Sequence, residues 1–186
     1  MTDCIQLTFQ TLQNVARKGF RLGSYHHVER RMMDVHNATS KPNHQGIIFG
    51  LWDSRTYQIQ YWLRCDRYVQ RDVFWLFNKF EDAMTWESKC HVLRSRILDS
   101  HYPPLVSLMD WAGILERLAV FYTYELITYN CQSYCRVLSQ LFCIHNGAIW
   151  EPPHITFIRV ATAVLSLGQS EFYVLRSISD CQYSTV

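Results

Sequence analysis

A cysteine at the expected start of a helix has the residue type and context for nucleophilic chemistry. Asparagine is a favoured N-cap residue, so Asn130 predicts a helix that begins at Cys131. The first turn of a helix presents unpaired N–H groups and a partial positive charge. Both favour a thiolate over a thiol at Cys131. The same N–H groups, including that of Gln132, could line an oxyanion hole during acyl transfer.

A thiolate nucleophile needs a base, and His44 is the best candidate in the sequence. It begins a short apolar strand, in which Gly46 would let another part of the chain approach closely. A third group must orient the imidazole through its second nitrogen. Side chains alternate along the strand that follows, so Gln58 and Gln60 share a face. We expect Gln60 to accept the second imidazole N–H, with Gln58 as the alternate.

The same residues also have plain structural interpretations. Cys131 could be an inert core thiol, and His44 could be a strand histidine bonded to the backbone. Cys135 lies one helical turn after Cys131 and could be a resolving thiol or a small core residue. His26 and His27 lack the Cys-x-x-Cys or His-x-x-x-His spacing of a zinc site. We therefore expect no metal and no cofactor.

Composition limits the class of protein. A chain of 186 residues fits one domain, which we expect to span residues 1–186 with its core at about 24–145. The net charge of +2 argues against a generic nucleic-acid binder, and no specific nucleic acid is expected as a partner. The chain has seven cysteines, an odd number. Its N-terminus does not have the pattern of a secretory signal. We expect free thiols in a reducing, cytoplasmic compartment.

Hydrophobic periodicity separates expected strands from expected helices. The strand-like segments are residues 25–36, 44–50, 57–63 and 89–97, the second and third of which should form a hairpin. The helix-like segments are residues 5–18, 71–80, a helix opened by Pro103 and Pro104, and about 131–143. Segregation of the two types favours an α+β domain, with a small antiparallel sheet packed against helices.

The apolar segment at residues 155–168 bears on membrane contact. It has 14 residues and includes Arg159, whereas a membrane-spanning helix needs about 20 apolar residues. We expect a core or interfacial helix there, and an interfacial one would give peripheral membrane association.

Two of these motifs resemble those of a known family. Residues 44–50 (HQGIIFG) resemble the His-box of the lecithin:retinol acyltransferase-like family, a branch of the permuted papain-like, NlpC-type thiol enzymes. Asn130 and Cys131 resemble its Asn-Cys box, and the spacing of 87 residues from His44 to Cys131 suits the family. The resemblance covers roughly residues 40–143. It implies a permuted papain-like fold, a Cys131 nucleophile, a His44 base and an acyl-cysteine intermediate.

The sequence departs from the family at three places. Gln45 stands where an aromatic residue is usual, and glutamine is offered where the third residue is commonly histidine. Gln132, Ser133 and Tyr134 follow the cysteine, where the family usually has Glu-His-Phe or Gln-His-Phe.

Three functions remain open on this basis. The resemblance implies a thiol acyltransferase or acyl hydrolase that takes an acyl group from a lipid ester or similar donor. The same fold also serves cysteine peptidases and isopeptidases, which need a polar cleft beside the nucleophile instead of an apolar slot. A non-catalytic interaction protein that retains the two boxes is the third, because the departures above affect residues next to the nucleophile and the base.

Overall fold

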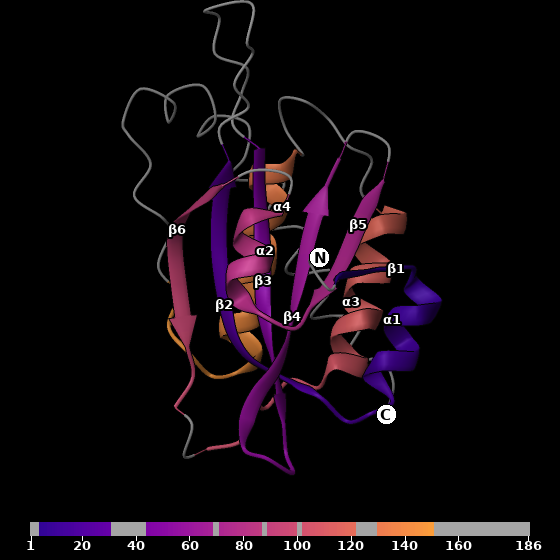
Figure 1. Ribbon diagram of the computed structural model, residues 1–186, viewed down its shortest axis with the longest axis vertical. Helices are drawn as coiled ribbons and strands as arrows, with labels where there is room; N and C mark the ends of the chain where they lie inside the picture. Colours follow the sequence, from indigo (N-terminus) through magenta and orange to yellow (C-terminus); the bar gives the residue numbers. More distant parts are fainter. Residues whose placement is uncertain are drawn as a thin grey trace, which may run out of the picture.

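The computed structural model describes residues 4–30, 44–68, 71–86, 89–99, 102–121 and 130–150. Within these residues the chain forms a six-stranded antiparallel sheet and four helices (Figure 1). The expected α+β class and antiparallel sheet are therefore confirmed. The strand order is β1-β5-β4-β3-β2-β6. The strands are β1 (Cys4–Leu7), β2 (Arg21–Arg30), β3 (His44–Asp53), β4 (Gln58–Arg67), β5 (Asp72–Phe77) and β6 (Cys90–Ile97).

The helices lie on both faces of the sheet. They are α1 (Phe9–Ala16), α2 (Phe80–Thr85), α3 (Leu108–Phe121) and α4 (Cys131–His145). Figure 1 shows α2 in front of the sheet and α4 behind it. Alternation along β3 follows this arrangement, since Ile47, Phe49 and Leu51 pack in the core with α1, α3 and α4. Ile48 points to the other face and packs in a second cluster with Ala83 of α2.

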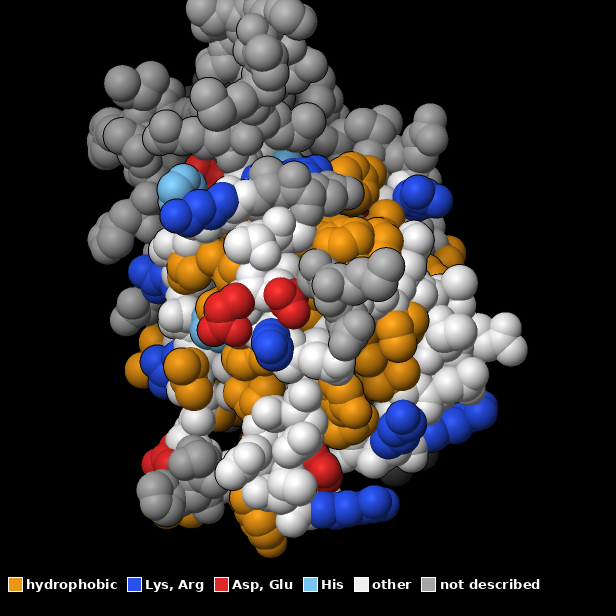
Figure 2. Space-filling view, viewed as in Figure 1, with side chains coloured by type: hydrophobic (Ala, Val, Ile, Leu, Met, Phe, Trp, Pro, Cys, Tyr) orange, Lys and Arg blue, Asp and Glu red, His pale blue; other side chains and the backbone are white. Residues whose placement is uncertain are grey.

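The second face is covered less completely, because α2 has only six residues. Figure 2 shows hydrophobic side chains reaching the surface on this face. Trp62, Trp75 and Trp86 are half-buried there and belong to the second cluster. These aromatic residues therefore pack with α2, whereas α4, which begins at Cys131, packs on the opposite face.

Several expected elements are confirmed. Residues 44–50 and 57–63 form the β3–β4 hairpin, with Asp53 paired to Gln58 beside the turn. The strand expected at 89–97 is β6, and the helix expected at about 131–143 is α4.

The helix predicted at residues 71–80 is wrong, because most of that segment is strand β5. Its apolar run is buried from both sides between the two clusters, and a continuous apolar run does not distinguish a buried strand from a helix. Two helix starts also differ. Residues 4–7 form β1, and α1 begins only after Thr8, whose side chain makes a capping box with Thr11.

The third expected helix begins at Leu108, after the two prolines. The hydroxyl of Ser107 accepts the Asp110 N–H at 3.1 Å and so caps the first turn of α3.

Residues 31–36 of the first expected strand and the apolar segment at 155–168 lie outside the described residues. In the part of the chain that the structure describes, no helix is long and apolar enough to cross a membrane.

Candidate active site

The N-terminus of α4 places Cys131 beside the sheet. Asn130 is the N-cap, as expected, and its side-chain oxygen accepts the N–H groups of Gln132 at 2.9 Å and Ser133 at 3.2 Å. The Ser133 hydroxyl in turn accepts the Asn130 N–H at 2.8 Å, which completes a capping box. The cap uses the Gln132 N–H, so this amide is not a donor for an oxyanion. The Cys131 N–H is not one of the two amides that the cap uses.

His44 begins β3, and its imidazole meets the Cys131 side chain. The Cys131 side chain lies close enough to the imidazole to contribute to the raised pKa of His44. Cys131 is 7 % exposed and His44 8 % exposed, so the pair is shielded from water but not sealed from it. The structure therefore brings together the nucleophile and the base expected from the sequence, from segments 87 residues apart.

The third polar group is Asp66, near the end of β4. Its Oδ1 lies 3.0 Å from His44 Nε2, and its side chain is 1 % exposed. A carboxylate only accepts hydrogen bonds, so the imidazole carries a proton on Nε2 and has Nδ1 left for Cys131. Gly46 makes room for this contact, because a Cβ at that position would overlap Asp66 Oδ1.

The structure does not bring Gln60 or Gln58 to His44. Gln58 pairs with Asp53 next to the hairpin turn, and Gln60 donates to the Thr56 hydroxyl at 2.8 Å. Roughly seven residues of strand, or about 23 Å, separate that end of the sheet from His44.

A signal for Asp66 is present in the sequence. In a hairpin the start of the first strand faces the end of the second, so the partner of His44 belongs near residues 66–68. The isolated charges in the apolar strand, Arg64 and Asp66, also indicate a buried ion pair.

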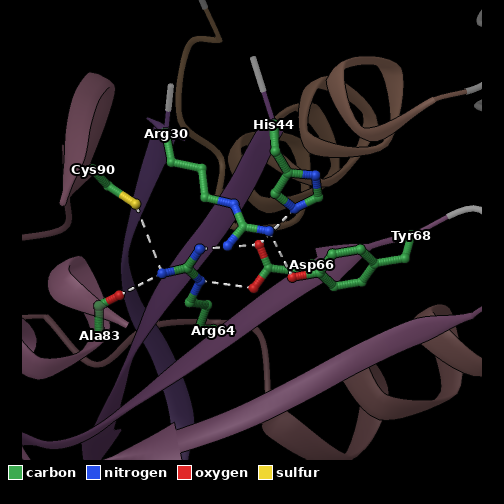
Figure 3. Close-up of polar contacts among 7 residues, drawn as sticks. All are labelled: Arg30, His44, Arg64, Asp66, Tyr68, Ala83 and Cys90. Atoms are coloured by element: carbon green, nitrogen blue, oxygen red, sulfur yellow. Dashed lines mark hydrogen bonds and ion pairs between the residues drawn. The ribbon is translucent and has the colours of Figure 1, made fainter. Parts of the chain in front are cut away.

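Arg64 binds Asp66 through two hydrogen bonds (Figure 3). Its Nε donates to Oδ2 at 2.7 Å, and its Nη2 donates to Oδ1 at 3.2 Å. Its remaining terminal nitrogen, Nη1, donates to the backbone oxygen of Ala83 at 2.7 Å and contacts Cys90 Sγ at 3.8 Å. The guanidinium is thus fixed at both ends, between the active-site carboxylate and α2.

Burial and charge oppose each other at this site. Burial alone lowers the pKa of His44, but the hydrogen bond that Asp66 accepts, the proximity of Cys131 and the charges of both groups outweigh it and raise that pKa to about 9. Burial alone raises the pKa of Asp66, but the hydrogen bond from His44 and the charge of Arg64 lower it below its usual range. At neutral pH the site therefore holds an imidazolium between the Asp66 carboxylate and the Cys131 sulfur.

Tyr68 holds the face of the imidazole ring. The two rings are stacked, with their centroids 4.8 Å apart and their planes at 13°. Arg30 Nη2 donates to the Tyr68 hydroxyl at 3.1 Å (Figure 3). The imidazole is thus held at one edge by Asp66 and on one face by Tyr68, which restricts its rotation.

The other cysteines in the described residues have a different character. Cys65 and Cys135 are free thiols and are fully buried. Burial raises the pKa of the Cys135 thiol well above its usual value, which leaves it as a core thiol and makes it a poor resolving residue.

Two further features lie away from Cys131. His26 packs against Trp62 and Phe80, whereas His27 bonds to Gln45, and no cluster within the described ranges could hold a metal ion. A depression of about 290 Å³ lies at β1, β4 and β5 and is lined by Cys4, Ile5, Tyr61, Leu76 and Asn78.

Comparisons of the chain with family models, with curated proteins and with solved structures find no match.

Proposed function

We propose that this protein is a thiol acyltransferase or acyl hydrolase that acts on lipid esters through an acyl-Cys131 intermediate, within a permuted papain-like fold. The observation that carries the proposal is the meeting of Cys131, His44 and Asp66 from α4, β3 and β4. A nucleophile, a base and a group that orients the base are the parts that covalent acyl transfer requires. In the folded chain the histidine strand precedes the cysteine helix, which is the order that the permuted fold would require.

The proposed reaction begins from a thiolate and an imidazolium, since the raised pKa of His44 keeps its ring protonated at neutral pH. The Cys131 sulfur attacks the ester carbonyl carbon and forms a tetrahedral oxyanion. The C–O bond to the leaving alcohol breaks as Nδ1–H of His44 protonates the departing oxygen. A thioester on Cys131 and a neutral His44 remain.

The second half returns the site to its starting state. An amine, an alcohol or water attacks the thioester carbonyl while His44 Nδ1 accepts its proton. The C–S bond then breaks and Cys131 leaves as a thiolate. The Cys131 N–H, which the Asn130 cap does not use, would donate to the oxyanion in both halves.

The lipid part of the proposal rests on the resemblance of residues 44–50 and Asn130-Cys131 to the two family boxes. Asp66 supplies the third polar group that the sequence had offered only as glutamine, and this favours a competent site over a non-catalytic one. Peripheral membrane contact through residues 155–168 stays a prediction, because that segment lies outside the described residues.

A substrate panel tests this function. Purified protein is incubated with a fluorogenic long-chain fatty-acyl ester and with a peptide ester, each with and without a primary amine acceptor. We expect turnover of the acyl ester by the wild type and by the matched control Cys135→Ala. We expect none by Cys131→Ala, and a loss of about 10²-fold or more by His44→Ala.

The products separate the classes. An acyl amide indicates a transferase, and free fatty acid alone indicates a hydrolase. Preference for the peptide ester would replace the lipid proposal with a peptidase. No turnover of either ester would favour the non-catalytic interpretation.

A further inference from the structure

We infer that Arg64 is a positioning residue for the Cys131–His44 pair and that it acts through Asp66. The inference rests on the proposed thiol chemistry and deepens it, because it assigns the group that holds the carboxylate that bonds His44. Arg64 does not contact His44 in the hydrogen-bond network, so any effect on the imidazole is transmitted by the carboxylate.

The geometry fixes the orientation of the carboxylate. Two parallel N–H groups of Arg64 bind both Asp66 oxygens, and Oδ1 is also the atom that faces His44 Nε2. The anchor of Arg64 Nη1 on the Ala83 oxygen at 2.7 Å holds the guanidinium from its other end. In Figure 3 the Arg64 guanidinium lies between Ala83 and Asp66, and the Asp66 carboxylate lies between Arg64 and His44. Lysine has no such planar fork and cannot make both contacts to Asp66.

The consequence for chemistry follows from what holds the carboxylate in place. With Arg64 present both Asp66 oxygens are held, and Oδ1 stays in position to accept the proton on His44 Nε2. Without Arg64 the buried carboxylate loses two hydrogen bonds and can rotate away from Nε2. The imidazole is then no longer held with Nδ1 towards Cys131, so it stabilises the Cys131 thiolate less well at neutral pH.

Other ionisable groups face this pair and enter the interpretation of any pH profile. They come from each element packed around it: His44 on β3, Arg30 on β2, Cys90 on β6, Cys131 and Cys135 on α4, with Cys65 in β4 and Tyr68 just after it. Burial raises the pKa of Cys65, Cys90 and Cys135, which disfavours ionisation of these three thiols.

The same strand offers a matched control. Arg67 and Asp72 form a second buried ion pair, with 3.5 Å between Nε and Oδ1 and side-chain exposures of 6 % and 2 %. This pair does not include the carboxylate that bonds His44. Replacing Arg67 likewise leaves a buried carboxylate without its guanidinium, and also removes a contact with the Tyr134 ring of α4, but it does not remove a hydrogen bond of Asp66.

The experiment measures the rate of Cys131 alkylation by iodoacetamide from pH 5 to 10, site by site, by peptide mass spectrometry. The variants are Arg64→Met, Arg64→Lys, Asp66→Asn, the double variant Arg64→Met with Asp66→Asn, and Arg67→Met. The tautomer of His44 is recorded in parallel from its ring ¹⁵N shifts. The double variant removes both charges together, so it keeps the fold where a single variant leaves one charge buried alone.

We expect Arg64→Met and Asp66→Asn each to slow alkylation at pH 7 by about tenfold or more, and to move the rising limb of the profile to higher pH. Alkylation of the double variant should be no slower than that of Asp66→Asn. Arg64 acts only through Asp66, so its loss has no further effect once Asp66 is replaced. Arg64→Lys should be intermediate, and Arg67→Met should change the rate less than about twofold.

Two results would overturn the inference: losses in the double variant that equal the product of the single losses, or an unchanged profile in Arg64→Met. Failure of the proposed function is a different result. In that case wild-type Cys131 would react no faster than Cys4 and would not respond to His44→Ala.

Discussion

The pKa of His44 makes the stability of the protein depend on pH in a defined direction. Burial lowers that pKa, but Asp66 and Cys131 raise it to about 9 in the folded chain, against 6.5 for the unfolded residue. The imidazolium therefore stabilises the fold fully below pH 6.5, and this stabilisation is lost as the pH rises through 9. A difference of 2.5 pH units corresponds to about 3 kcal/mol.

The test compares His44→Gln with the wild type. Glutamine keeps an N–H that can donate to Asp66 but carries no titratable group. We expect the wild type to exceed the variant in free energy of unfolding by about 3 kcal/mol more at pH 6 than at pH 9.5. The assay is urea denaturation across that range, with the exposed histidine variant His91→Gln as the matched control.

The Cys131→Ala background separates the effect of Asp66 on the pKa of His44 from the effect of Cys131. In Cys131→Ala the contribution of the sulfur is absent, so the pH-dependent difference should shrink while keeping its sign, because Asp66 remains. The reasoning is refuted if the difference between the wild type and His44→Gln is flat with pH. Titration of the His44 ring near 6.5 by NMR would refute it equally.

Three further predictions concern the groups around the site and the second face. Gly46→Ala should cost about 1–3 kcal/mol of unfolding free energy and slow Cys131 alkylation by displacing Asp66. Gly113→Ala on α3, where an added Cβ would make only an ordinary contact with the Arg117 side chain at 3.8 Å, should stabilise by up to about 1 kcal/mol in the same urea assay. Burial lowers the pKa of His26 to about 4, so its neutral ring stabilises the fold above pH 6.5. About 3 kcal/mol of unfolding free energy is therefore lost as the pH falls to 4, and His26→Phe should remove this loss. An equal loss in both proteins would contradict this. Asn130→Ala should cost about 1 kcal/mol, and Asn130→Asp less, in thermal melts, because the cap accepts two N–H groups.

The start of α4 and the β3–β4 hairpin were predictable because their signals are local. An asparagine cap sets the position of Cys131, and a turn between two alternating segments sets the hairpin. Cys131 and His44 could therefore be selected from the sequence as the candidate nucleophile and base. That residues 72–77 form a strand could not be predicted, because their apolar residues also satisfy helical spacing. Only burial on both faces distinguishes this strand from a helix.

The third residue was missed because it depends on register. Alternation along β4 predicts that Gln58, Gln60 and Asp66 share one face of the strand, so alternation does not select the partner of His44 among them. The choice is decided by the antiparallel pairing, which aligns Gly46 with Asp66 and carries Gln60 to the other end of the sheet. The role of Arg64 depends in addition on α2, which supplies the Ala83 oxygen from a segment 19 residues away.

Acylation of the protein by an activated long-chain fatty-acyl ester tests whether Cys131, with His44 as its base, accepts an acyl group. Brief exposure at pH 7 is followed by intact-protein and peptide mass spectrometry. We expect one acyl group on the wild type, as a hydroxylamine-sensitive thioester on Cys131. The acyl group should be absent from Cys131→Ala, retained in Cys135→Ala and formed about 10²-fold more slowly in His44→Ala. Acylation at the more exposed Cys4 instead, or at Cys131 with no dependence on His44, would contradict this expectation.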